Sequence, residues 1–459
     1  MATGATPPAS VFKAYDVRGL YGDELDGDAA HLIGRAFARV LAGLRGKRTS
    51  DLTIGLGHDM RLTSPEMAAR ACDGMVAEGA RVLDAGRVAT EQLYFLVGSR
   101  DLDGGAMVTA SHNPKPYTGV KLLREQALAL SGDAGIQEVR ATIEGGLPEP
   151  AGGGSVEGVE VGPEFREHVM GFVEPSSIGP LRVLAYGSDG MAGPMVGPLL
   201  EELNLELRTA SWEPSGDFPD RGPNPMLEES QAEIAARIGE EDVDLAIAWD
   251  GDADRCFFFD SQARFCEGDF ICALLARALL RKEPGAMVLY DPRSSRVVPD
   301  TVAAEKGRTG LSRVGHAFFK TRMREAGAVF GGEVSGHYYF RDFFCADSGT
   351  IPALLMLELI STGGASLSEL MDRFRSRYFI SGEINSEVAD QQAKMREIEE
   401  RWGEGEIDHL DGVSIDYPDW HFNVRPSNTE PLLRLNLESL VSRGDMEAKR
   451  DEVLALIRA

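Results

Sequence analysis

The sequence predicts an α/β protein with three related mixed α/β domains followed by a smaller C-terminal α+β domain. Two observations predict this fold class. A strand–loop–helix pattern occurs three times along the chain, and the residues after 377 follow a different pattern. The 459 residues are enough for about two to four domains of ordinary size. With 43% hydrophobic and 26% charged residues, the chain has the composition of a globular protein.

Each of the three repeats begins with an apolar run, which predicts a strand, and continues through a polar loop into a helical pattern. The runs are 52–57, 181–186 and 286–290, and the helices after them are expected from residue 64, over 195–203 and over 297–305. Because Ser64 precedes Pro65, we expect Ser64 to cap the first of these helices. Such alternation of strands and helices is typical of α/β domains.

The glycine- and proline-rich stretch 145–154 (GGLPEPAGGG) predicts the clearest connection between domains. We therefore expect domains at 1–154, 155–264, 265–377 and 378–459. The last of these has the order helix, turn, strand, strand, helix, which predicts the α+β domain.

The charge of the chain excludes partners that bind through basic surfaces. It carries 47 Lys and Arg against 73 Asp and Glu, a net charge of −26. Nucleic acids and anionic membranes repel such a protein, so we expect neither as a partner, and an anionic substrate needs a local basic pocket. The longest apolar runs, 270–280 and 351–360, contain Arg277 and Glu358 and are shorter than the ~20 residues of a membrane span.

The sequence also indicates a cytoplasmic location. Its first ten residues lack the basic and apolar regions of a signal peptide. The five cysteines are odd in number and form no C-x-x-C pair, so we expect reduced thiols.

Four loops carry residues suited to chemistry, and the first is 109–114 (TASHNP). It follows the strand-like run 105–108, and ligands bind at the carboxyl ends of strands in open α/β sheets. Ser111 is therefore a candidate nucleophile, although Ser-x-Asn-Pro also starts ordinary turns. We do not expect a hydrolase pair of Ser111 with His112, because adjacent side chains of an extended segment point to opposite faces and no G-x-S-x-G motif is present.

The second loop is 250–255 (DGDADR), after the apolar run 243–249. Asp250, Asp252 and Asp254 can converge on one hard divalent cation such as Mg²⁺. An EF-hand is excluded because glycine is absent from the sixth position and glutamate from the twelfth. An aspartyl phosphatase of the haloacid-dehalogenase type is disfavoured by the residue after the second acid. A solvated acidic turn is the remaining alternative.

The third and fourth loops suit a phosphorylated sugar. In 331–337 (GGEVSGH), Glu333, Ser335 and His337 share one face if the segment is extended, which suits a polyhydroxylated ring. The alternative is a glycine-rich hairpin with incidental polar groups. The loop 425–431 (RPSNTEP) offers a guanidinium, hydroxyls, an amide and backbone N–H groups that could cradle a phosphate, or it is a turn with a surface arginine.

The four loops in this order resemble the α-D-phosphohexomutase superfamily, in particular its phosphomannomutase/phosphoglucomutase family. The resemblance covers nearly the whole chain and includes FKAYDVRG (12–19), GHDMRLTSP (57–65), GHAFFKTRM (315–323) and YYFRDFFCADSG (338–349). It implies that the four domains surround a central active-site cleft. Thr118, the segment 186–189 and Arg293 depart from the usual family residues, but all four loops are intact.

The resemblance also implies residue roles. Ser111 would be the phosphoserine and would bind Mg²⁺ through its phosphate together with Asp250, Asp252 and Asp254. The remaining catalytic residues would be Arg18, His112, Lys121, Arg255 and His337. The substrate-binding residues would be Tyr15, Arg293, Gly315, His316, Glu333, Ser335, Arg425, Ser427, Asn428 and Thr429.

The implied reaction is reversible transfer of phosphate between O1 and O6 of a small-molecule hexose phosphate, through phosphoserine and a hexose 1,6-bisphosphate that is both intermediate and activator. Lys121 and His337 are the candidates for the general base. The enzyme is expected to be a monomer or a homodimer.

Three alternatives stay open from the sequence. Phosphoglucosamine mutase is the nearest, although its fourth loop usually reads Ser-Gly-Thr where this chain has Ser427-Asn428-Thr429. A metal-dependent sugar-phosphate phosphatase would use the same acids but release phosphate. A catalytically inactive sugar-phosphate-binding protein would be expected to lack Ser111 or one of the acids, and this chain has lost none of them.

Overall fold

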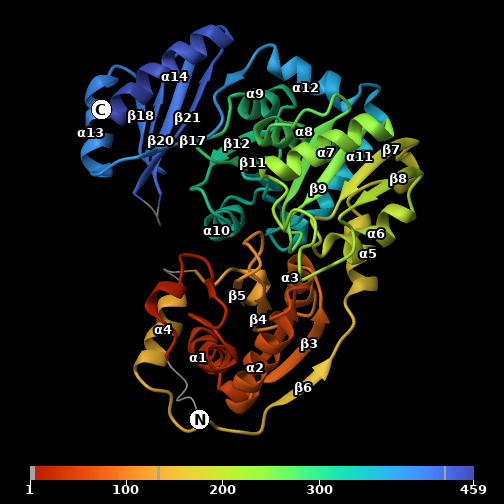
Figure 1. Cartoon of the computed structure of the whole chain (residues 1–459), viewed down its shortest axis with the longest axis vertical. Helices are drawn as coiled ribbons and strands as arrows, with labels where there is room; N and C mark the ends of the chain where they lie inside the picture. The colour runs from red at the N-terminus through yellow and green to blue at the C-terminus, as the bar shows by residue number, and fades with distance from the viewer. Residues whose placement is uncertain (1–5, 132–134, 428–430) are drawn as a thin grey trace. The chain divides into compact units, whose positions relative to one another are not determined.

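The computed structural model describes residues 6–131, 135–427 and 431–459 (Figure 1). Its contacts divide the chain into two compact units. The first unit consists of Met1–Phe265 and His337–Gly364, and the second of Cys266–Gly336 and Ala365–Ala459. Each unit contains at least one complete sheet and a hydrophobic core of its own.

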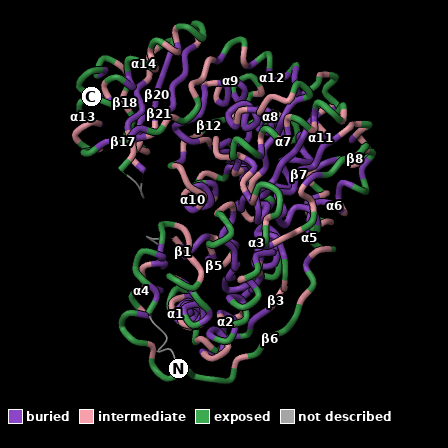
Figure 2. The backbone as a smooth tube through the Cα atoms, in the orientation of Figure 1, coloured by how far each residue is buried: buried purple, intermediate pink, exposed green. Residues whose placement is uncertain are grey.

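The first unit begins with a six-stranded mixed sheet. Its strand order is β1-β5-β4-β2-β3-β6, with bounds β1 (Val17–Leu20), β5 (Tyr117–Arg124), β4 (Gly104–Val108), β2 (Thr53–His58), β3 (Arg81–Arg87) and β6 (Ser155–Gly158). Strands β4, β2, β3 and β6 are parallel, whereas β5 is antiparallel to β1 and β4. Strand β6 is exposed and forms the edge of this sheet (Figure 2). It begins directly after residue 154, the expected end of the first domain. The boundaries after residues 154, 264 and 377 stay predictions.

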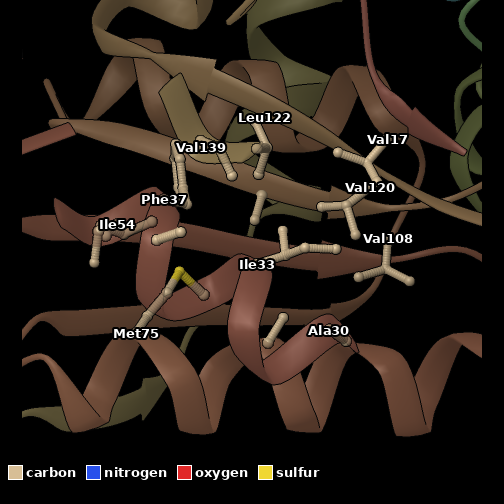
Figure 3. Packing of buried hydrophobic residues seen from close by; sticks show 14 of the residues in the cluster. Val17, Ala30, Ile33, Phe37, Ile54, Met75, Val108, Val120, Leu122 and Val139 are labelled. Atoms are coloured by element: carbon tan, nitrogen blue, oxygen red, sulfur yellow. The ribbon is translucent and has the colours of Figure 1, made fainter. Parts of the chain in front are cut away.

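Four helices belong to this sheet: α1 (Gly27–Arg45), α2 (Ser64–Ala77), α3 (Thr90–Ser99) and α4 (Ile136–Glu144). Ile33 and Phe37 of α1 belong to one buried cluster with Val120 and Leu122 of β5 (Figure 3). Helices α1 and α2 approach so closely that a Cβ on Gly34 would lie 2.2 Å from the Ala71 oxygen. The core therefore depends on small residues where the two helices meet.

The first strand–loop–helix repeat is confirmed by β2 and α2, but the expected helix cap is wrong. Ser64 is the first residue of α2, and Thr63 is the N-cap residue without a side-chain capping bond. The Ser64 hydroxyl donates instead to Asp59 Oδ1 at 2.6 Å. The hydroxyl therefore ties the loop after β2 to the helix and leaves the helix N–H groups to other partners.

A second sheet in the first unit has the order β10-β9-β7-β8. Its strands are β10 (Cys256–Asp260), β9 (Leu245–Trp249), β7 (Leu181–Tyr186) and β8 (Leu205–Ala210), of which only β10 is antiparallel to its neighbour. The unit also contains α5 (Gly162–Met170), α6 (Ala192–Glu201), α7 (Glu228–Glu241) and α11 (Thr350–Gly363), and the antiparallel pair β14 (Tyr338–Phe340) and β15 (Ala346–Asp347). Strand β7 and helix α6 confirm the second repeat.

The second unit begins with three parallel strands, β11 (Met287–Tyr290), β12 (Arg308–Leu311) and β13 (Phe330–Gly332). Its helices in this part are α8 (Gly268–Lys282), α9 (Val297–Ala304), α10 (His316–Ala326) and α12 (Leu367–Arg375). Strand β11 and helix α9 confirm the third repeat.

The C-terminal part of the second unit is an antiparallel sheet with two helices. The strand order is β16-β21-β20-β19-β18, and β17 also pairs with β21. The bounds are β16 (Phe379–Ile380), β17 (Ile384–Glu387), α13 (Gln391–Arg401), β18 (Glu406–Asp408), β19 (Val413–Asp416), β20 (Trp420–Pro426), β21 (Leu432–Ser439) and α14 (Arg443–Arg458). The expected α+β arrangement is present. The expected number of two strands between the helices is wrong, because the described residues form four strands between α13 and α14.

All five cysteines are buried thiols. Among the described residues no single helix is long and apolar enough to cross a bilayer, although α11 and α12, bent at the break between them, would pass as a pair by length and composition.

Candidate active site

Ser111 lies in the loop after β4, where the sequence placed the nucleophile. Its side chain is buried, and its φ of +49° is in the left-handed region. Ser111 Oγ donates to Asp250 Oδ2 at 2.9 Å and lies 3.2 Å from His112 Nδ1. The expectation that Ser111 and His112 point to opposite faces is therefore wrong, because the backbone between them is not extended.

Arg61 holds this loop from the inside. Its side chain is only 2% exposed, and it forms an ion pair with Asp59 at 3.3 Å. The two terminal nitrogens donate to four backbone oxygens, those of Ser111 (2.8 Å), Asn113 (2.6 Å), Pro114 (3.1 Å) and Tyr117 (3.2 Å). Arg61 lies in the segment 57–65 but was not among the residues predicted for the site. The only signal for it was its place in a segment that carries the family resemblance.

We expect Arg61→Lys to lower kcat by roughly 100-fold and to leave KM close to the wild-type value. A lysine keeps the charge, but a single ammonium cannot reach four carbonyl oxygens, and small displacements of a reacting group cost about this much. Steady-state kinetics of the two purified proteins would measure the effect. Arg70→Lys is the control, because Arg70 on α2 makes a surface ion pair with Asp28. A normal kcat, or a rise in KM alone, would contradict the positioning role of Arg61.

The three predicted metal ligands lie together beside Ser111. Asp250, Asp252 and Asp254 are at most 1% exposed, and one carboxylate oxygen of each lies within 4.8 Å of the others. Asp252 Oδ1 and Asp254 Oδ1 are buried and have no hydrogen-bond partner in the described part of the chain. A Cβ on Gly251 would lie 2.8 Å from the Ser111 carbonyl oxygen, so only glycine lets the two loops approach this closely.

Two cationic side chains, Lys121 and Arg255, form ion pairs with these acids. Lys121 Nζ on β5 lies 2.5 Å from both Asp252 Oδ2 and Asp254 Oδ2. Arg255 donates through Nε and Nη2 to Asp250 Oδ2, at 2.9 and 2.6 Å. Three carboxylates against two cations leave one negative charge before any phosphate binds. The unpartnered oxygens and this excess charge both fit a divalent cation with oxygen ligands.

The pKa values of the acids reflect this crowding. Burial alone would raise the pKa of Asp252, but the charge and hydrogen bond of Lys121 and a 2.6 Å bond from Thr90 Oγ1 outweigh it and lower the pKa. Burial and the neighbouring Asp252 carboxylate raise the pKa of Asp254 to about 6. The same surroundings therefore favour the charged form of Asp252 and the protonated form of Asp254.

His337 lies in the same group, although it comes from a distant segment. A ring nitrogen of His337 lies within 4.8 Å of carboxylate oxygens of Asp254 and Asp347. Its Nδ1 is 3.0 Å from Asp347 Oδ2. Burial would lower the pKa of His337, but the hydrogen bond with Asp347 and the charge of Asp254 raise it. Asp347, which the sequence analysis missed, therefore orients His337.

The remaining predicted residues of the first unit lie around the serine loop. Arg18 on β1 donates to Asn113 Oδ1 at 2.6 Å, and Tyr15 is half-buried in the bend just before β1. The charge of Arg255, then burial and Arg18, lower the pKa of His112 well below its usual value. Both arginines also contact a carboxylate, Arg18 that of Asp16 and Arg255 that of Asp250, so they place positive charge at the serine loop without making it basic overall.

A cavity of about 710 Å³ adjoins the serine loop. His112 and Lys115 line it from that loop, and Phe218 and Arg221 line it from the segment 217–229. The same segment supports the acids, because the Pro223 oxygen accepts a 2.9 Å bond from the Gly251 amide. The volume is in the range of small-molecule sites.

The second unit holds the predicted sugar-binding residues. Arg293 forms a two-pronged bond with Asp291, with both distances 2.8 Å. Glu333 Oε2 accepts from the Gly315 amide at 3.0 Å and lies 3.6 Å from Arg293. Gly315 has a φ of +119°, which glycine tolerates, and His316 begins α10 directly after it.

The shared face proposed for Glu333, Ser335 and His337 is not present. The Gly336 amide donates to the Glu333 oxygen at 3.1 Å, and Gly336 has a φ of +87°. Residues 333–336 therefore form a turn, in which half-buried Ser335 does not alternate with its neighbours as it would in a strand.

The predicted phosphate cradle is described in part. Arg425 lies near the end of β20, and buried Ser427 follows that strand. Asn428 and Thr429 lie outside the described residues. Arg434 on β21 contacts Ser427 Oγ at 3.4 Å, and Glu383 contacts both arginines. Arg434 and Glu383 were not among the residues predicted from the sequence.

Comparison with known proteins assigns the chain to a family. The four domains of phosphoglucomutase/phosphomannomutase match in order: alpha/beta/alpha domain I over residues 9–147, domain II over 163–263, domain III over 267–378 and the C-terminal domain over 383–456. The chain belongs to the phosphoglucomutase/phosphomannomutase family. The predicted fold class and the predicted enzyme class, an intramolecular phosphotransferase acting on hexose phosphates, are thereby confirmed.

Relatives in this family are similar over nearly their whole length. A phosphohexose mutase of Xanthomonas campestris pv. campestris is 41% identical, over 97% of this chain and 99% of its own. A phosphomannomutase of Escherichia coli is 40% identical, over 97% and 99% of the two chains. The crystal structure of a phosphoglucomutase/phosphomannomutase family protein from Burkholderia thailandensis matches with a TM-score of 0.90 and 29% identity, over 98% of this chain and 97% of that one.

Proposed function

We propose that the chain interconverts the 1-phosphates and 6-phosphates of mannose and glucose, with Ser111 as the phosphoryl carrier. The observation that carries the proposal is the position of Ser111 Oγ, buried 2.9 Å from Asp250 Oδ2 in a loop that Arg61 holds. Family membership supports the hexose phosphate as substrate.

In the proposed transfer, the bond between Ser111 Oγ and phosphorus breaks while a free hexose hydroxyl forms its own bond to that phosphorus. The product is a hexose 1,6-bisphosphate, and its other phosphate then returns to Ser111. The hydroxyl proton goes to a base. His337, oriented by Asp347, suits this role better than Lys121, because the Lys121 ammonium is engaged by two carboxylates.

Mg²⁺ is the metal we propose for Asp250, Asp252 and Asp254, with the Ser111 phosphate as a further ligand. The fit rests on the three convergent buried carboxylates and their two unpartnered oxygens. When bound, the ion would neutralise charge on the transferring group. Arg18, Lys121 and Arg255 add positive charge around the same group, and His112 lies against the Ser111 hydroxyl.

The rest of the substrate is proposed to bind in the second unit. Its hydroxyls and reacting end would contact Arg293, Gly315, His316, Glu333 and Ser335, with Tyr15 of the first unit as a further contact. Its non-reacting phosphate would bind Arg425, Ser427, Asn428 and Thr429. The cytoplasmic location, and a monomer or homodimer as the assembly, stay predictions.

Coupled assays with mannose 1-phosphate, glucose 1-phosphate and glucosamine 1-phosphate would test this function. We expect kcat/KM for the first two sugars to differ by no more than about 10- to 200-fold. A small difference at one carbon of the ring changes the free energy of the transition state by only about 1–3 kcal/mol. A much lower value is expected for glucosamine 1-phosphate. A preference of many thousandfold between mannose and glucose, or net release of inorganic phosphate as from a phosphatase, would contradict the proposal.

A further inference from the structure

Glu383 lies among three arginines of the second unit. It follows Gly382, which has a φ of +68°, in the segment between β16 and β17. Its Oε2 accepts from Arg425 Nη2 at 3.0 Å and lies 3.6 Å from Arg293 Nη1. Its Oε1 accepts from Arg434 Nη1 at 3.2 Å. One carboxylate therefore contacts three guanidinium groups, two of which are assigned above to the substrate.

The charges of the described side chains in this cluster already balance without a ligand. Ion pairs link three arginines and three carboxylates: Arg293, Arg425, Arg434, Asp291, Glu333 and Glu383. A phosphate monoester brings up to two further negative charges. Bound beside an unchanged cluster, it would leave a net negative charge in a partly buried site, which is unfavourable. We therefore expect one carboxylate to leave the arginines when the phosphate binds.

Glu383 is the carboxylate that is able to move. Asp291 is fully buried and accepts from the backbone amide of Arg293 at 2.9 Å. Glu333 is 2% exposed and accepts from the Gly315 amide at 3.0 Å. The Glu383 side chain is 28% exposed and makes no hydrogen bond to a described backbone amide. It can leave the arginines without breaking a backbone contact.

We propose that Glu383 is an internal counter-ion that occupies the place of the non-reacting phosphate of the substrate and leaves it when the substrate binds. This inference rests on the proposed function, since it takes Arg425 as a phosphate ligand. The apparent affinity for a phosphate monoester is then lowered by the fraction of molecules in which Glu383 holds the arginines. A neutral sugar cannot displace a carboxylate from three guanidinium groups, so Glu383 also selects for phosphorylated ligands.

Glu383 stays charged in this state. Burial would raise the pKa of its carboxyl group, but the charges of Arg425 and Arg293 and the bond from Arg425 outweigh burial and lower the pKa. Competition with phosphate is therefore expected throughout the neutral pH range.

Calorimetric titration of inorganic phosphate and of mannose 6-phosphate into the whole protein tests this inference. Glu383→Gln keeps the shape of the side chain and removes its charge, so we expect both dissociation constants to fall by about fivefold or more. Glu406→Gln is the matched control, because Glu406 is an exposed acid on β18 of the same sheet, and it should bind like the wild type. Glu383→Ala is a second variant that is expected to tighten binding in the same direction.

Weaker or unchanged binding in both Glu383 variants would overturn the inference. Weaker binding would mean that the carboxylate orients the arginines for the ligand, and unchanged binding would mean that it does not compete with the ligand. Arg425→Ala separates this failure from failure of the proposed phosphate site. If Arg425→Ala weakens binding while the Glu383 variants do not tighten it, only the counter-ion role fails. If Arg425→Ala binds phosphate like the wild type, the assignment of the phosphate site fails with it.

Discussion

Ser111→Ala is expected to lower mutase turnover by several orders of magnitude and to remove the phosphate that we expect the intact protein to carry on this residue. We do not expect the nearby Thr109 to take over, because its Oγ1 accepts a 2.8 Å bond from the backbone amide of residue 111, which the substitution leaves in place. A covalent carrier that splits one transfer into two cannot be replaced by the groups that merely surround it. Intact-mass spectrometry and a coupled assay measure the two effects.

The loss should be confined to chemistry. The residues assigned to the sugar and its non-reacting phosphate are elsewhere, so Ser111→Ala is expected to bind hexose 6-phosphate with nearly wild-type affinity. Ser176→Ala, which removes an exposed hydroxyl from the same unit, controls for the substitution itself. Phosphate found only on another residue, or near-normal turnover of Ser111→Ala, would refute the carrier role.

The repeats of the fold were predictable because their signals are local. Each apolar run and the helix after it lie within about 25 residues, and the periodicity of apolar residues identifies such segments directly. The C-terminal domain was predicted less completely. Strands β18 (EID) and β19 (VSID) are short, and alternating polar residues leave no long apolar run. Their pairing with β20 depends on tertiary contacts that a local pattern does not contain.

The candidate site shows the same division. Ser111 and the three acids could be proposed from the sequence because each loop directly follows an apolar run, and the acids are spaced two residues apart within one loop. Arg61 could not, because its contact with Ser111 spans 50 residues of sequence, and Glu383 contacts Arg434 across 51. The contact between Ser111 and His112 was missed for another reason, since it depends on a left-handed backbone that residue types alone do not announce.

Asp252→Asn is expected to abolish most activity and to remove the response of the protein to Mg²⁺. A neutral amide replaces one of three carboxylates that converge on the proposed ion, and hard divalent cations bind carboxylate oxygens far better. Lys121 keeps its 2.5 Å contact with Asp254, so the fold should survive the change. Asp73→Asn on α2 is the control, because that carboxylate is 63% exposed.

Metal binding can be read without turnover, which separates it from the chemistry. Ligands that bind only the folded state raise its melting temperature, so Mg²⁺ should raise the Tm of the wild type and of Asp73→Asn but not that of Asp252→Asn. Exhaustive chelation should abolish the mutase activity of the wild type, and added Mg²⁺ should restore that activity. Full activity of the chelated wild type would contradict the metal role, because Arg18, Lys121 and Arg255 would then suffice beside the three acids and the phosphate. We expect the loss of activity because a phosphate dianion and three carboxylates carry more negative charge than these three cations offset.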